Sequence, residues 1–181
     1  MAIFYISDTH FGHKNILKYD ARPYFTVEEM DADLIKRWNS VVKKDDTVYH
    51  LGDFSWLKPD GEHEILRQLN GNKILIRGNH DYKPTEDWTA VLSVAEIVDG
   101  DRRVVLSHFP IASYKNMSHG WYHLYGHVHG AFEDLLFDAY RERWEKQYDK
   151  KMRSANVGCM KSYMDYTPRT LDEISAVRKW T

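Results

Sequence analysis

Short apolar runs that end in metal-binding types of side chain recur along this chain of 181 residues. Five such places carry Asp, Asn or His, and they follow one another in a fixed order: Asp8-Thr9-His10, Gly52-Asp53, Gly78-Asn79-His80-Asp81, His108 and Gly126-His127-Val128-His129. In an open α/β sheet, ligands gather beyond the carboxyl ends of the strands. The pattern therefore predicts an α/β fold in which several strand ends converge on one site.

The periodicity of the apolar residues predicts the elements that deliver these motifs. A helix is expected after Thr26, with Glu29 completing a capping box. Asp60 is expected to cap a short helix and Pro84 to stand in the first turn of another. Strands are predicted at 3–7, 47–51, 73–77, 94–98, 102–107, 121–125 and 155–157, an amphipathic helix at 132–152, and a helix or strand at 171–178.

The spacing within two of the motifs predicts shared ligation. Residues two apart on an extended segment point to the same side, so Asp8 and His10 are expected to hold one ion together. His127 and His129 are expected to reach neighbouring ions. Glycines 52, 78 and 126 are expected to let the backbone turn sharply and to keep bulk away from the site.

The ligand types limit the choice of metal. Oxygen and imidazole nitrogen without thiolate suit manganese, which is the first expectation, and also iron, cobalt, nickel or zinc. Two ions that share a carboxylate sit roughly 3.5–4 Å apart and clamp the attacking and leaving oxygens of a phosphoryl group.

The five motifs in this order resemble the calcineurin-like metallophosphoesterase superfamily, whose pattern runs D-x-H, G-D, G-N-H-[DE], H and G-H-x-H. The likeness extends from residue 8 to residue 129, and the segments Ser7 to His13 and Val48 to Phe54 resemble small bacterial and phage members. The resemblance implies a four-layer αββα sandwich of two mixed β-sheets. It also implies in-line attack on phosphorus by a hydroxide that bridges two metals.

The resemblance further implies a role for each motif residue. Asp53 would bridge the two ions, and His80 would act as the general acid or stabilise the transition state, oriented by Asp81. The first ion would be bound by Asp8, His10 and His129, and the second by Asn79, His108 and His127.

Two residues outside the motifs are candidates for substrate binding. Arg22 precedes a proline in a loop near the first motif, and its guanidinium could grip a phosphate. His13 could contact the substrate. By contrast, His50 is expected to pack in a strand, His63 to be solvated, and Cys159 to be a small core residue.

The composition excludes several classes of protein. A net charge of −2 gives no strong signal of nucleic-acid binding, and a single cysteine allows no intramolecular disulfide. The apolar run at the start is too short for a signal peptide, and no run reaches the roughly 20 residues of a membrane span. We expect a cytoplasmic protein without a membrane partner.

The expected function is a metal-dependent phosphoesterase acting on phosphodiesters of small or nucleotide-like substrates. A phosphomonoesterase with the same centre is the nearest alternative, and extra cationic contacts such as Arg22 would favour it. A metal-binding scaffold without activity is a third. We expect one domain over residues 1–181, with a helical insertion at about 131–152 that walls the pocket or pairs the subunits of a homo-oligomer.

Overall fold

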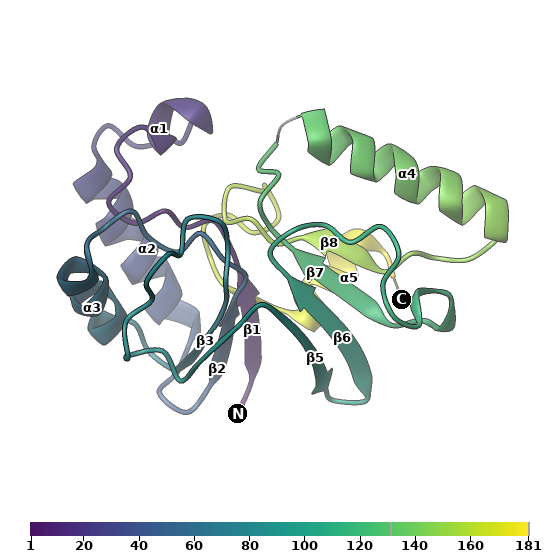
Figure 1. The fold of residues 1–181 in the computed structure, drawn as a ribbon, viewed down its shortest axis with the longest axis horizontal. Helices are drawn as coiled ribbons and strands as arrows, with labels where there is room; N and C mark the ends of the chain where they lie inside the picture. Colours follow the sequence, from purple (N-terminus) through teal and green to yellow (C-terminus); the bar gives the residue numbers. More distant parts are fainter. Residues whose placement is uncertain (131, 181) are drawn as a thin grey trace.

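The computed structural model describes residues 1–130 and 132–180 and contains two mixed β-sheets with helices on their outer sides (Figure 1). This confirms the expected α/β sandwich. The helices are α1 (Ile16–Tyr19), α2 (Val27–Val41), α3 (Pro59–Gln68), the 3-10 turn η1 (Met117–His119), α4 (Phe132–Tyr148) and α5 (Leu171–Arg178). The strands are β1 (Ile3–Ile6), β2 (Thr47–His50), β3 (Asn72–Ile76), β4 (Ala90–Leu92), β5 (Val94–Asp99), β6 (Arg102–Ser107), β7 (Tyr122–Tyr125), β8 (Ser154–Asn156) and β9 (Arg169–Thr170).

Parallel strands bring the motifs together. The first sheet has the order β4-β3-β2-β1-β9, in which β1 to β4 are parallel and β9 is antiparallel. The second has the order β5-β6-β7-β8, in which β6, β7 and β8 are parallel and β5 is antiparallel. The carboxyl ends of β1, β2, β3, β6 and β7 each lead into one of the five motifs, so these ends form the frame of the site.

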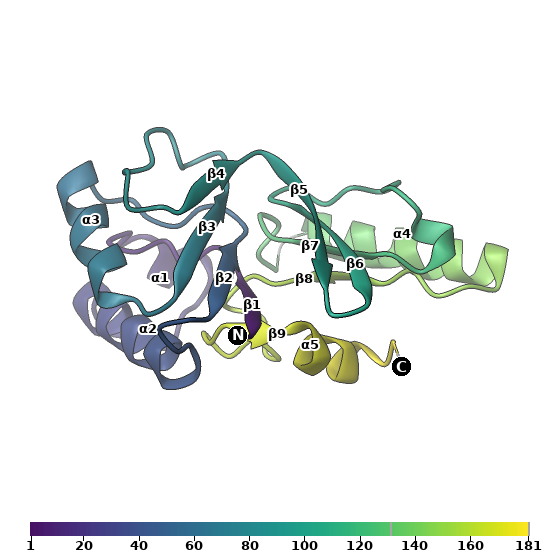
Figure 2. The ribbon, with the colours of Figure 1, turned by 90° about the horizontal axis from the view of Figure 1, so that it is seen from below.

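Alternation along β6 and β7 separates two cores. Val104, Leu106 and Leu124 belong to the large core that lies between the sheets. Val105 and Tyr125 point the other way and pack with Phe137 of α4 in a smaller cluster. Figure 2 shows α2 and α3 beside the first sheet and α4 beside the second. Each sheet is therefore covered on its outer side by its own helices.

Several sequence-based expectations need correction. Residue Lys58 is the N-cap of α3 and makes no side-chain capping bond, while Asp60 lies within the first turn. No helix follows Pro84, because this segment is a loop that leads into β4. Neither β4 nor β9 was predicted, since both are too short to show a period. Thr26 accepts a hydrogen bond from Glu29 as expected, but the Glu29 carboxylate accepts from the preceding Phe25 amide instead of closing the box.

The amphipathic stripe of α4 faces solvent over much of its length. Phe132, Leu135 and Leu136 are more than half exposed, and Tyr140 is exposed as well. The opposite side packs on the second sheet through Phe137 and Trp144, and Asp134 accepts a hydrogen bond from Asn156 of β8 at 3.0 Å. The exposed part of the stripe is thus not explained by the core, whereas Trp144 and Met152 pack in the smaller cluster. Residue 131, the first of the expected insertion, lies outside the described residues, and the single-domain organisation stays a prediction.

Candidate metal centre

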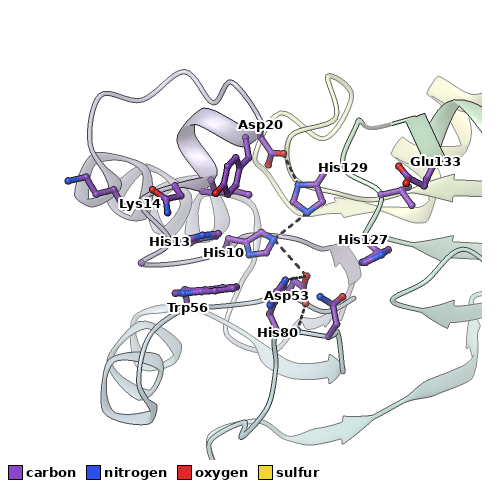
Figure 3. Close-up of a pocket in the computed structure, with 16 residues that line it drawn as sticks. His10, His13, Lys14, Asp20, Asp53, Trp56, His80, His127, His129 and Glu133 are labelled. Carbon is purple, nitrogen blue, oxygen red and sulfur yellow. Dashed lines mark hydrogen bonds and ion pairs between the residues drawn. The ribbon is translucent and has the colours of Figure 1, made fainter.

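Three of the predicted ligands form a first group at the carboxyl ends of β1 and β7. Ligand atoms of Asp8, His10 and His129 all lie within 4.8 Å of one another. The Nε2 atoms of His10 and His129 are 3.3 Å apart (Figure 3). His129 Nε2 is 3.5 Å from Asp8 Oδ1. Metal–nitrogen bonds of about 2.0–2.1 Å at angles near 90–110° place two ligands about 3 Å apart. These distances therefore fit ligands of a single ion.

A second group adjoins the first. Ligand atoms of Asp53, His108 and His127 lie within 4.8 Å of one another, and Asn79 Oδ1 is 3.0 Å from His108 Nε2. The Oδ2 atom of Asp53 is 3.5 Å from His108 Nε2 and 3.8 Å from His10 Nε2. This oxygen thus lies between the two groups, where a bridging carboxylate is expected. The structure brings together all seven predicted ligands, and their binding of metal stays a prediction.

Left-handed backbone, rather than strand alternation, aims these ligands. The φ angles are 58° at Asp8, 51° at His10, 56° at Asp53, 71° at His127 and 44° at His129. The expectation that Asp8 and His10 share an extended segment was therefore wrong. Each such residue costs roughly 1–2 kcal/mol, and strain of this kind concentrates where function over-determines the backbone.

All three motif glycines leave space that a Cβ would fill, and at Gly52 this Cβ would lie 2.5 Å from His108 Nδ1. A Cβ at Gly78 would lie 2.3 Å from Asp53 Oδ1, and one at Gly126 would lie 2.5 Å from Asp8 Oδ2. Gly52 alone of the three has a positive φ, of 89°. The predicted sharp turn therefore applies to Gly52, while Gly78 and Gly126 leave space for the carboxylates.

Hydrogen bonds to the far ring nitrogens orient two of the imidazoles. His108 Nδ1 is 2.7 Å from the Leu51 carbonyl oxygen, so this nitrogen carries a proton and Nε2 is the atom that a neutral ring would offer to a metal. His129 Nδ1 is 2.7 Å from Asp20 Oδ1. Asp20 was not predicted, because it lies in a loop far along the chain from His129 and belongs to none of the five motifs.

The charges of the site set the protonation of its imidazoles. Burial lowers the pKa of His10 to about 3. Burial alone would also lower the pKa of His129, but hydrogen bonds and charges of Asp20 and Asp8 outweigh it and raise that pKa to about 10. Burial likewise opposes ionisation of Asp8, yet His129 holds the pKa of this carboxyl below its usual range. An ion bound by His129 would therefore have to displace a proton from this ring.

His80 and Asp81 have different surroundings. The His80 side chain is about one-third exposed, at 32 %, and its Nε2 is 3.9 Å from Asp53 Oδ2. It thus faces the space above the bridging position. Asp81 does not hold the His80 ring. Its carboxylate accepts hydrogen bonds from the backbone amides of Asp53, Phe54 and Gly78. Asp81 therefore links the loop after β2 to the loop after β3.

The expectation that Arg22 contacts the substrate needs correction. Its side chain is fully enclosed and donates to the carbonyl oxygens of Asp8 and Thr9 at 2.7 and 2.8 Å. It also forms an ion pair with Asp20 at 2.9 Å. Arg22 therefore supports the first ligand loop from behind. The reason is local: these carbonyls and Asp20 satisfy the guanidinium completely, leaving none of it for a ligand.

A cavity of about 830 Å³ opens over the ligands. His13 lies in its wall, with its ring stacked on Trp56 at a centroid distance of 4.2 Å (Figure 3). This position suits the predicted substrate contact, which remains a prediction. Lys14, Tyr19 and Glu133 of α4 also line the cavity and were not predicted. The helix predicted to wall the pocket does so at its amino-terminal end.

The remaining predicted side chains lie as follows. His50 is buried and contacts the Thr9 hydroxyl at 3.0 Å, as expected of a packed strand residue. Cys159 is buried and its thiol donates to the Asp8 carbonyl, as expected of a small core residue. His63 is partly exposed and pairs with Asp87 at 2.6 Å. Within the described residues, no helix is both long and apolar enough to cross a bilayer.

Two comparisons find proteins similar over nearly the whole chain. An uncharacterized protein of Methanocaldococcus jannaschii is 39% identical over 174 residues, which are 95% of this chain and 88% of the relative. The crystal structure of a protein of unknown function from Aquifex aeolicus superimposes with a TM-score of 0.71 at 27% identity, and the match covers 97% of this chain and 98% of that one.

A third relative is similar over part of the chain. The gene 66 protein of Mycobacterium phage L5 is 45% identical over 80 residues, which are 42% of this chain and 38% of the phage protein. The model of one family, described as the calcineurin-like phosphoesterase superfamily domain, matches residues 1–173. The two mixed sheets and the paired Asp and His groups agree with that match, and the chain belongs to the calcineurin-like phosphoesterase superfamily.

Proposed function

We propose that the protein hydrolyses phosphodiesters of small or nucleotide-like substrates with the help of two divalent ions, manganese first among them. The observation that carries this proposal is the position of Asp53. Its Oδ2 atom is 3.5–3.9 Å from the Nε2 atoms of His108, His10 and His80. One carboxylate oxygen is thus adjacent to both ligand groups and to the predicted acid, as hydrolysis by in-line attack requires.

When bound, such ions lower the pKa of water towards neutrality and neutralise the charge of a phosphate group. The side chains around these ions have different roles. Asp53 holds the two halves of the centre together, and Asp20 keeps the His129 ring aimed at the first half. His80 donates a proton to the leaving oxygen, because its ring is partly exposed to the cavity and its Nε2 is 3.9 Å from Asp53 Oδ2. Arg22 and Asp81 fix the loops and touch no substrate.

The burial of Arg22 bears on the choice between diester and monoester. A monoester is a dianion, and the case for it depended on this guanidinium. Since Arg22 is enclosed, Lys14 in the cavity wall is the cation that a monoester would have to use. Substitution Lys14→Ala should leave diester turnover within about two-fold. Loss of monoester turnover alone in this variant would support a phosphomonoesterase.

The test of the proposed function uses protein loaded with manganese, a chromogenic diester and the matching monoester. His80→Ala should retain two equivalents of metal and lose roughly 10²–10⁴ in rate. His119→Ala changes an exposed histidine outside the site and is the matched control. Loss of metal from His80→Ala would contradict its assignment as the acid. Bound metal without turnover of either ester, with several metals tried, would favour a scaffold.

We also propose that a second copy of the chain covers the exposed stripe of α4. Phe132, Leu135 and Leu136 form an exposed apolar face with helical spacing. Exposed apolar patches on a protein surface commonly mark sites of protein–protein contact. Antiparallel pairing centred near residue 138 would bring Glu133 of one copy close to Arg143 of the other. Both charged residues are exposed, so this contact would be complementary.

A further inference from the structure

A second cavity of about 350 Å³ lies beyond His80. It adjoins the cavity over the ligands, because His80 and Trp56 line both. Leu57, Tyr82 and Lys83 form other parts of its wall. A volume of this size is at the small end of ligand pockets and suits one ring system. A substrate with its phosphate above Asp53 can therefore extend past His80 into this space.

Trp56 presents a fixed aromatic surface at the boundary of the two cavities. The residue is 50 % exposed, although the His13 ring stacks on it at 4.2 Å with an angle of 10° between the planes. The His80 ring lies 4.5 Å away, and the Trp56 amide donates to the Phe11 carbonyl at 2.8 Å. The indole is thus held in place while half of it stays in water. Because the indole is already immobilised, stacking of a ligand on it costs little conformational entropy.

One partly buried hydrogen-bond network holds both walls of the second cavity. The Glu62 carboxylate accepts a hydrogen bond from the Ser55 hydroxyl at 3.2 Å, next to Trp56. It also accepts from the Thr85 amide at 3.2 Å and from the Trp88 indole at 3.0 Å, behind the loop that carries Tyr82. Glu62 therefore fixes the distance between the Trp56 side and the Tyr82 side. Tyr82 itself is 77 % exposed, so its ring is free to cover a ligand.

We propose that this second cavity binds the nucleobase of the leaving alcohol of a phosphodiester, stacked against Trp56. The inference rests on the proposed function, because it takes His80 as the proton donor to the leaving oxygen. In hydrolysis a water oxygen bonds to phosphorus, the ester bond to the nucleoside oxygen breaks, and His80 supplies the proton for that oxygen. The group released on the His80 side lies at the entrance of the second cavity. Lys83 at its rim adds a cation near the base edge.

Two esters isolate the contribution of the base. Methyl adenosin-5′-yl phosphate and methyl ribos-5-yl phosphate release the same type of primary alcohol and differ only in the adenine. The unaltered protein should turn over the adenosine ester at least about ten-fold faster in kcat/KM, as expected for one base–aromatic stack. Trp56→Ala should bring this ratio close to one, and Trp56→Phe should keep most of it.

Tyr19→Ala is the matched control, since Tyr19 is an exposed aromatic residue that lines only the first of these two cavities. A ratio that collapses in Tyr19→Ala but survives in Trp56→Ala would overturn the inference and place the base over the metal centre. Equal turnover of the two esters by the unaltered protein would also overturn it, while leaving the phosphoesterase function intact.

Binding of adenosine itself separates the inference from the proposed function. Saturation-transfer NMR should detect adenosine on the unaltered protein, much less on Trp56→Ala, and ribose on neither. If neither ester is hydrolysed but adenosine binds through Trp56, the site stands without the enzyme activity. If adenosine does not bind and the adenosine ester shows no preference, the second cavity is not a base site.

Discussion

Replacement of Arg22 by methionine tests whether this residue is structural or contacts the substrate. The substitution keeps a long side chain but removes the hydrogen bonds to the Asp8 and Thr9 carbonyls and the ion pair with Asp20. Breaking a buried charged network by removal of one partner costs about 3–5 kcal/mol. For a chain of this size, a loss of about 3 kcal/mol lowers Tm by roughly 6–12 °C. Urea unfolding of the metal-free protein measures the free energy directly.

Arg37→Met is the matched control, because the Arg37 side chain is 35 % exposed and pairs with the partly exposed Asp33. Exposed pairs of this kind contribute about 1 kcal/mol or less. The Arg22 variant should also bind the first metal more weakly, since Asp20 would lose one of its two cationic partners. A variant as stable as the parent, with a raised KM for esters and unchanged kcat, would refute the structural role.

Three further outcomes are expected. Gly126→Ala should lower bound metal from two equivalents to one, since its Cβ would lie 2.5 Å from Asp8 Oδ2. A Cβ at Gly130 has no atom within 4 Å, so Gly130→Ala is the control and should keep both equivalents. Equal metal contents in the two variants would contradict this prediction. His50 and His123 are buried and burial lowers the pKa of each from 6.5 to about 3, so the unfolded state takes up their protons first and stability falls as pH drops below about 6.5. Each of these two histidines should lower the free energy of unfolding by about 2 kcal/mol between pH 8 and pH 5. His123→Gln should remove half of their joint pH dependence, as measured by urea unfolding at each pH. The unaltered protein should sediment as a dimer and Leu136→Glu as a monomer; a monomeric parent would rule out the proposed contact through α4.

The sequence predicted the ligands because their residue types and their order along the chain do not depend on the backbone conformation of each motif. Each motif follows an apolar strand, and parallel strands bring their carboxyl ends to one edge whatever the loops do. One of the wrong expectations concerned local geometry at the ligands. Asp8 and His10 were placed on an extended segment, yet both have left-handed φ angles. Left-handed conformation at a non-glycine residue is maintained by surrounding contacts, and these are not visible in a single stretch of sequence.

The amino-acid sequence by itself determined which Asp, Asn and His side chains come together and which strands deliver them. The tertiary structure decided which charged residues reach the cavity and which are enclosed. Arg22 and Asp20 are separated by one residue, yet together they form a buried pair behind Asp8 and His129. Burial and hydrogen bonding depend on contacts between segments distant along the chain. For that reason only the folded molecule shows that Arg22 supports the site, and that Trp56 stands half exposed at its edge.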